Sequence, residues 1–108
     1  MFGFLRVIWE KPAETRPDGV GEPSLAELAR ALRRPLPPGF EWSWLHHDHC
    51  ALGLAHRLWP GRVRSATTYE VVRGLGISPR TAYDLFVGYH GDRPRDVARA
   101  IERHLEGA

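Results

Sequence analysis

The chain has 108 residues, of which 43% are hydrophobic, and this size suits one domain with a single modest core and excludes two domains. The net charge of +2 excludes a wholesale polyanion binder, and the lone cysteine excludes an intramolecular disulfide and favours a reducing, cytoplasmic location. No apolar run reaches the length of about 20 residues that a membrane span needs, and the first residues lack a signal-peptide pattern. We therefore expect a soluble protein that does not contact a membrane.

Residues 1–23 are predicted to form a strand followed by a loop. The segment Phe2–Trp9 is rich in aromatic and branched side chains, which favours a strand that ends before Pro12. The Asp18-Gly19 turn signal suggests a hairpin that returns through Val20. An unpaired strand is an exposed edge, so the strand is expected to pair within the hairpin or with a second copy in a homo-oligomer.

The rest of the chain predicts about five short helices, and hence a mainly α single domain over 1–108 with a helix at 24–34 and a helical core at 40–107. Ser24 caps the first helix. The second, Cys50–Trp59, is capped by Asp48, and because it is apolar nearly all round it should be the central helix. The last three helices begin at Thr67, Ser78-Pro79 and Pro94, and end at Gly76, Gly88 and Gly107.

The segment 44–50 concentrates three imidazoles, one carboxylate and the only thiol. His46, His49 and Cys50 are weak metal candidates, because His46 and Cys50 share a face if the helix begins early. Cys50 is also a weak catalytic candidate, since a helix N-terminus and a neighbouring imidazolium such as His46 activate a thiol. The downstream histidines that could act as its base are His90 and His104. The spacing matches no standard zinc pattern and free cysteine is often buried. The prediction is therefore a buried core thiol, with no metal, no cofactor and no enzymatic activity.

The segment Thr68–Leu85 resembles a helix-turn-helix, with Gly76 at the turn. Residues 57–80 contain five arginines and one acid, a local charge of +4 that allows several phosphate contacts. Val72 stands where the motif usually has a small residue, and the negative charge of Asp84 would face the negatively charged DNA. The resemblance implies a DNA-binding alternative, for which the candidate residues are Arg62, Arg64, Arg73, Arg80 and Thr81.

A wider resemblance covers Phe40 to Leu105. Its blocks are the Trp44 loop, Cys-Ala-Leu-Gly-Leu-Ala from Cys50, Leu-Gly-Ile-Ser from Leu75, Leu85-Phe86, and Pro94-x-x-Val-Ala. In this order the chain is similar to small bacterial and phage proteins of uncharacterised function. Such proteins often carry an extra Gly and Cys where this chain has His47-Asp48-His49. The resemblance implies that residues 75–86 are core helices, and it implies no thiol or metal chemistry.

Tryptophans flank a serine at Trp42-Ser43-Trp44, directly after a proline-rich loop. Their rings either offer an aromatic platform or seal a thin core. The sequence as a whole predicts a non-enzymatic interaction or regulatory module for a protein partner, with Trp42, Trp44 and His47 as partner-binding candidates. A helix-turn-helix DNA-binding protein, and a cysteine- or metal-dependent site at His46–Cys50, are the alternatives.

Overall fold

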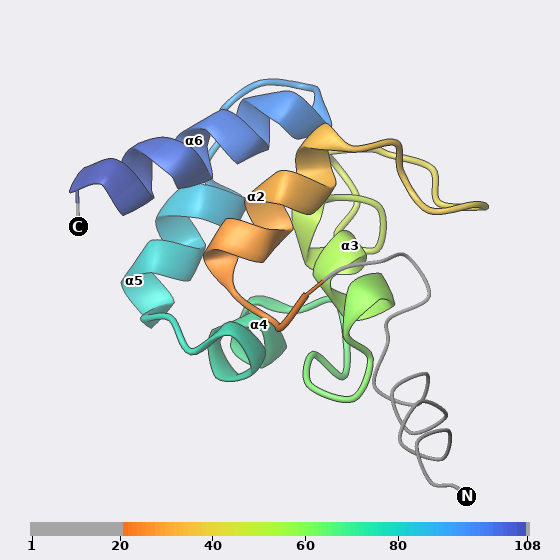
Figure 1. Cartoon of the computed structure of the whole chain (residues 1–108), viewed down its shortest axis with the longest axis horizontal. Coiled ribbons are helices and arrows are strands. Elements are labelled where there is room, and N and C mark those ends of the chain that lie inside the picture. The colour runs from red at the N-terminus through yellow and green to blue at the C-terminus, as the bar shows by residue number, and fades with distance from the viewer. Residues whose placement is uncertain (1–20, 108) are drawn as a thin grey trace, which may run out of the picture.

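The computed structural model of the chain describes residues 21–107, which form a mainly helical domain (Figure 1). The elements are α2 (Leu25–Arg33), α3 (Ala51–Leu58), α4 (Thr68–Leu75), α5 (Pro79–Ala82), the π-helix η1 (Tyr83–Val87) and α6 (Pro94–Gly107). Because η1 continues α5 directly, these elements make up the five predicted helical segments. Residues 21–107 contain no strand, and the strand predicted at Phe2–Trp9 with its hairpin lies outside them.

Three of the predicted helix starts are confirmed by their capping bonds. The side-chain oxygens of Ser24, Thr67 and Ser78 accept the backbone N–H of Glu27, Glu70 and Thr81 at 3.0, 3.2 and 3.0 Å, respectively. Such bonds satisfy donors that the first turn of a helix leaves free. Short polar residues in the sequence thus locate these helices to within a residue.

The predicted cap of α3 was wrong. The N-cap is Cys50, which makes no side-chain capping bond, and Asp48 lies before the helix. The reason is the preceding segment, where Ser43 N–H donates to His49 O and His49 N–H donates to His46 O, both at 2.8 Å. These bonds hold residues 43–49 in a closed loop, so helical geometry begins only after it.

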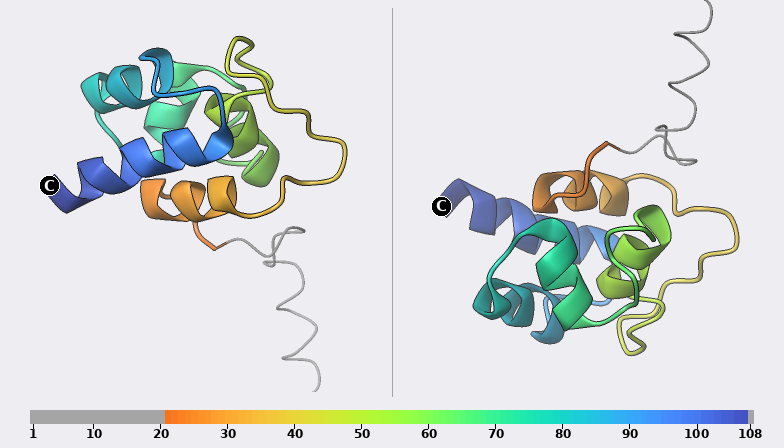
Figure 2. Two further views of the ribbon diagram at one scale, coloured as in Figure 1. Left: turned by 90° about the horizontal axis from the view of Figure 1, so that it is seen from above. Right: turned by 90° about the horizontal axis from the view of Figure 1, so that it is seen from below.

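Helix α6 lies between α2 on one side and α5 with η1 on the other (Figure 2). An exposed ion pair joins α2 to α6, because Arg33 donates two hydrogen bonds of 2.7 Å to the Glu102 carboxylate. The expected burial of α3 is confirmed, since all of Ala51–Ala55 is buried. The largest fully buried side chains are Trp59, Leu28, Leu54, Ile101, Val63 and Val71. Among the described helices, none has the length and apolar content needed to cross a membrane.

Glu27 is the one charged residue buried in the described part of the chain, with 6% of its surface exposed. Its carboxylate accepts hydrogen bonds from Arg30 at 2.9 Å and from Arg34 at 2.7 Å. Burial raises the pKa of Glu27. Hydrogen bonds from Arg34, the Gly21 backbone and Arg30 together lower it by more, so its pKa lies below the ordinary value of 4.5.

Glu27 should therefore make the free energy of unfolding of the domain depend on pH in the acidic range. A carboxylate whose pKa is lower in the folded than in the unfolded state stabilises the fold above the unfolded value, and this stabilisation is lost as the pH falls below 4.5 through the folded value. Glu27→Gln should lower the free energy of unfolding at neutral pH by about 2 kcal/mol. It should also make the free energy of unfolding decrease less steeply as the pH is lowered below 4.5. Urea unfolding at a series of pH values measures both effects.

Glu106→Gln is the matched control, because Glu106 is exposed and makes no ion pair with the other residues of 21–107. It should leave both the stability and its pH dependence unchanged. If the free energy of unfolding decreased equally with falling pH in wild type and in Glu27→Gln, the role assigned to Glu27 would be contradicted.

Candidate functional site

Helices α4 and α5 meet at a tight turn that sets the angle between them. Gly76 ends α4 in the left-handed conformation, with φ of 68°. Its N–H and that of Ile77 both donate to the carbonyl of Val72, at 3.0 and 3.2 Å. This arrangement is a common helix end, and glycine adopts it without the strain that a Cβ brings. The turn places the outward sides of α4 and α5 next to each other.

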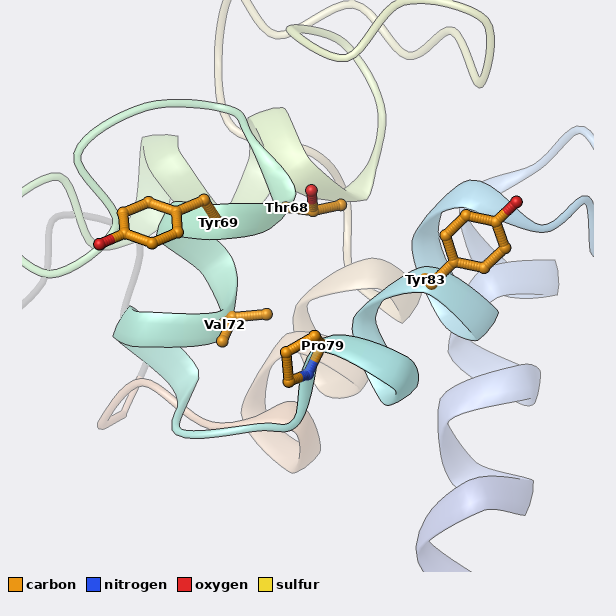
Figure 3. Close-up of a pocket in the computed structure, with 5 residues that line it drawn as sticks. All are labelled: Thr68, Tyr69, Val72, Pro79 and Tyr83. Carbon is orange, nitrogen blue, oxygen red and sulfur yellow. The ribbon is translucent and has the colours of Figure 1, made fainter.

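An apolar groove lies between these two helices, with a cavity volume of about 280 Å³. Its lining residues are Thr68, Tyr69, Val72, Pro79 and Tyr83. Figure 3 shows Thr68 and Val72 directed from α4 toward α5, Pro79 facing them, and the two tyrosines on opposite sides. We call it the tyrosine groove.

The two tyrosines are among the most exposed large apolar side chains of the described residues. Tyr69 is 68% exposed and Tyr83 is 64% exposed. Their exposure follows from helical periodicity, since Val71 and Leu85, two residues after each of them, face the buried core. The groove is thus built on the face that the core leaves free.

Arginines stand next to both tyrosines. The Arg73 guanidinium lies 5.9 Å from the centre of the Tyr69 ring and 3.2 Å from the Glu70 carboxylate. Arg80, one helical turn from Tyr83, has its Nε 3.8 Å from the Asp84 carboxylate. The groove therefore combines an apolar floor with a rim on which each arginine has an acidic neighbour.

The nucleic-acid candidates are only partly gathered at this face. Arg73 and Arg80 adjoin the groove, whereas Arg62 and Arg64 lie in the loop before α4, exposed and without an ion pair among residues 21–107. Thr81 is half-buried, and its hydroxyl accepts a hydrogen bond of 2.9 Å from Ser78. Its hydroxyl is thus part of the helix cap.

The tryptophans of the 42–44 segment tie two loops together. Trp42 Nε1 donates to the Asp92 carbonyl at 2.6 Å, and the Trp44 ring lies 4.6 Å from the ring of Tyr89. Tyr89 in turn donates to the Asp92 carboxylate at 2.6 Å, a bond that raises the pKa of the Tyr89 hydroxyl. His47 is exposed, with its Nε2 3.8 Å from the Asp48 carboxylate. Trp42 and Trp44 therefore hold the loop closed, with Trp44 still 40% exposed.

The histidine and cysteine candidates are spread over two loops. Cys50 is 8% exposed, and the hydrogen-bond partner of its Sγ is the carbonyl of His47, at 3.6 Å. The rings of His46 and His49 lie edge to face with centres 6.2 Å apart, and His90 Nε2 donates to the Asp84 carbonyl at 2.6 Å. Nowhere in residues 21–107 do three His, Cys, Asp or Glu side chains form a group that could hold a metal ion.

A wider depression of about 570 Å³ lies against α3. Two of its polar side chains are engaged in structural bonds, His56 with the Val63 carbonyl at 2.7 Å and Arg57 with the Pro38 carbonyl at 3.2 Å. The tyrosine groove, by contrast, leaves its aromatic walls exposed. We therefore take the groove as the functional site.

Tyr69 and Tyr83 were not among the site residues predicted from the sequence. The available signal was their position two residues before core residues of α4 and η1, which places large aromatic rings on solvent-facing sides. Comparisons with protein-family models, curated proteins and solved structures find no match for this chain. The two resemblances noted in the sequence stay predictions.

Proposed function

We propose that the protein is a small non-enzymatic interaction module that binds a partner protein in the tyrosine groove. The observation that carries the proposal is the pair of tyrosines, 68% and 64% exposed, on either side of an apolar depression. Tyrosine is enriched at protein interfaces because its ring contributes apolar contact area and its hydroxyl a hydrogen bond.

The size of the groove fits an anchor side chain of a protein partner. Its 280 Å³ falls just below the range of about 300–1,000 Å³ typical of small-molecule pockets. One or two apolar side chains fill such a volume, as anchor residues do at the centres of protein interfaces.

DNA binding by the same two helices is the second candidate. It is favoured by Arg62 and Arg64, which are exposed and unpaired among the described residues. Against it stands the apolar floor of the groove, because phosphates require charge and hydrogen bonds where this face offers Val72 and Pro79.

The test uses N-acetyl-tryptophanamide as a single-anchor probe, followed by NMR of the uniformly ¹⁵N-labelled protein. We expect the largest chemical-shift changes at the amides of Val72 and Tyr83. Tyr83→Ser should bind the probe at least about fivefold more weakly, since an interface anchor contributes about 1 kcal/mol or more. Leu45→Ser is the matched control, because Leu45 is 70% exposed but lies outside the groove. This variant should bind like wild type.

Shifts centred on Trp44 and abolished by Leu45→Ser would overturn the groove as the site and assign binding to the 42–49 loop. A duplex DNA titration separates the second candidate. A complex that weakens steeply from about 50 to 200 mM salt, and that Arg62→Ala and Arg64→Ala weaken, would replace the protein-binding proposal with DNA binding.

A further inference from the structure

We propose that the tyrosine groove accepts an acidic segment of the partner, in which one apolar side chain fills the groove and flanking carboxylates meet the rim. This inference rests on the proposed function and names the chemistry of the partner. It follows from where the positive charge of the chain is located.

The segment that supplies the lining residues of the groove carries a net positive charge. Residues 57–84 contain five arginines and two acids, a local charge of +3, whereas the whole chain carries +2. All other residues together are therefore slightly negative. Arg73 and Arg80 stand at the rim itself, and the Arg64 N–H, bonded to Glu70 at 3.2 Å, brings the loop before α4 next to it. A partner that enters the groove therefore meets these arginines first.

The acid beside Tyr69 contributes little negative charge to the surface. The Glu70 side chain is only 17% exposed, and its Oε1 accepts hydrogen bonds from the Arg64 N–H and from Arg73, both at 3.2 Å. The Arg73 side chain is 45% exposed. A carboxylate of the partner can thus reach the guanidinium while Glu70 stays in place.

The rim beside Tyr83 has both signs at the surface. The side chain of Arg80 is 88% exposed and that of Asp84 is 64% exposed. Their separation of 3.8 Å on the solvent side makes a weak ion pair, which a second carboxylate can compete for. Asp84 is then the residue that opposes an acidic partner, and its removal should favour one.

The experiment compares three short peptides that share one central tryptophan and differ in their flanks: Asp-Glu-Trp-Glu-Asp, Asn-Gln-Trp-Gln-Asn and Lys-Lys-Trp-Lys-Lys, each with blocked ends. At low salt the acidic peptide should bind about fivefold more tightly than the neutral one, and the lysine peptide more weakly than both. This preference should disappear at about 1 M salt, where the screening length is near 3 Å.

Two variants assign the preference to the rim. Arg80→Ala should reduce the acidic-over-neutral ratio of affinities, and Asp84→Asn should increase it, each relative to wild type in the same low-salt buffer. Arg95→Ala is the control, because Arg95 is exposed on α6 and outside the groove. It should leave the ratio as in wild type.

Equal affinities for the acidic and neutral peptides, or equal ratios in Arg80→Ala, Asp84→Asn and wild type, would overturn this inference alone, since the tryptophan would still bind. If none of the three peptides and no N-acetyl-tryptophanamide bound to the protein, the proposed function would be overturned as well. A dimer in sedimentation that Tyr83→Ser dissociates would assign the groove to a second copy of the chain.

Discussion

Gly53→Ala should destabilise the domain by about 3 kcal/mol, although alanine is normally the better helix former by about 1 kcal/mol. A Cβ at Gly53 would lie 2.1 Å from the carbonyl oxygen of Asp48 and 2.3 Å from its carbon. These are backbone atoms of the closed 43–49 loop, so they cannot rotate aside as a side chain does. Urea unfolding followed by circular dichroism measures the change.

Gly107→Ala is the control for this substitution. Gly107 is the last residue of α6, and a Cβ there has no neighbour within 4 Å. Its free energy of unfolding should stay within about 0.5 kcal/mol of wild type. If Gly53→Ala were equally well tolerated, the close approach of the loop to α3 would be wrong.

Trp59→Ala should cost about 4 kcal/mol, the second large effect, because truncation of a buried aromatic residue leaves a cavity. Trp59 is the largest fully buried side chain among residues 21–107, 1% exposed, and its Nε1 donates to the Gly21 carbonyl at 3.0 Å. The variant therefore loses both packing and the bond that holds Gly21. Thermal unfolding in the full chain should show a large drop in midpoint.

Trp44→Ala provides the comparison, since Trp44 is 40% exposed and its ring lies 4.6 Å from the ring of Tyr89. It should cost about 1 kcal/mol, the value of an aromatic contact at a partly exposed site. Similar losses of stability in the two variants would contradict the distinction between Trp59 as a core residue and Trp44 as a partly exposed loop residue.

The helices were predictable from the sequence because their ends depend on nearest neighbours. Ser24, Thr67 and Ser78 each bond to an N–H three residues later, and Gly76 supplies the left-handed end of α4. Such bonds need no information from the rest of the fold. Patterns of three to ten residues therefore determine them.

Features that depend on backbone bonds within loops, or on two helices already being in place, could not be predicted from the sequence. The closed loop that displaces the cap from Asp48 to Cys50 is held by backbone bonds that no side-chain pattern records. Likewise, the helix predicted from Ser78 to Gly88 changes to a π-helix at Tyr83, and the Asp84 carbonyl in that segment is bonded to His90. The groove required both helices in place before Tyr69 and Tyr83 could be seen to flank one depression.

The close packing of α2 against α6 also bears on how the chain acquires its structure during synthesis. The two helices are the first and the last of the described part, and the residues of their ion pair, Arg33 and Glu102, are 69 positions apart. Contacts between such distant segments close long loops and slow folding. The side of α2 that packs against α6 is therefore covered only after α6 has been made, so the core between these two helices is completed late in the order of synthesis.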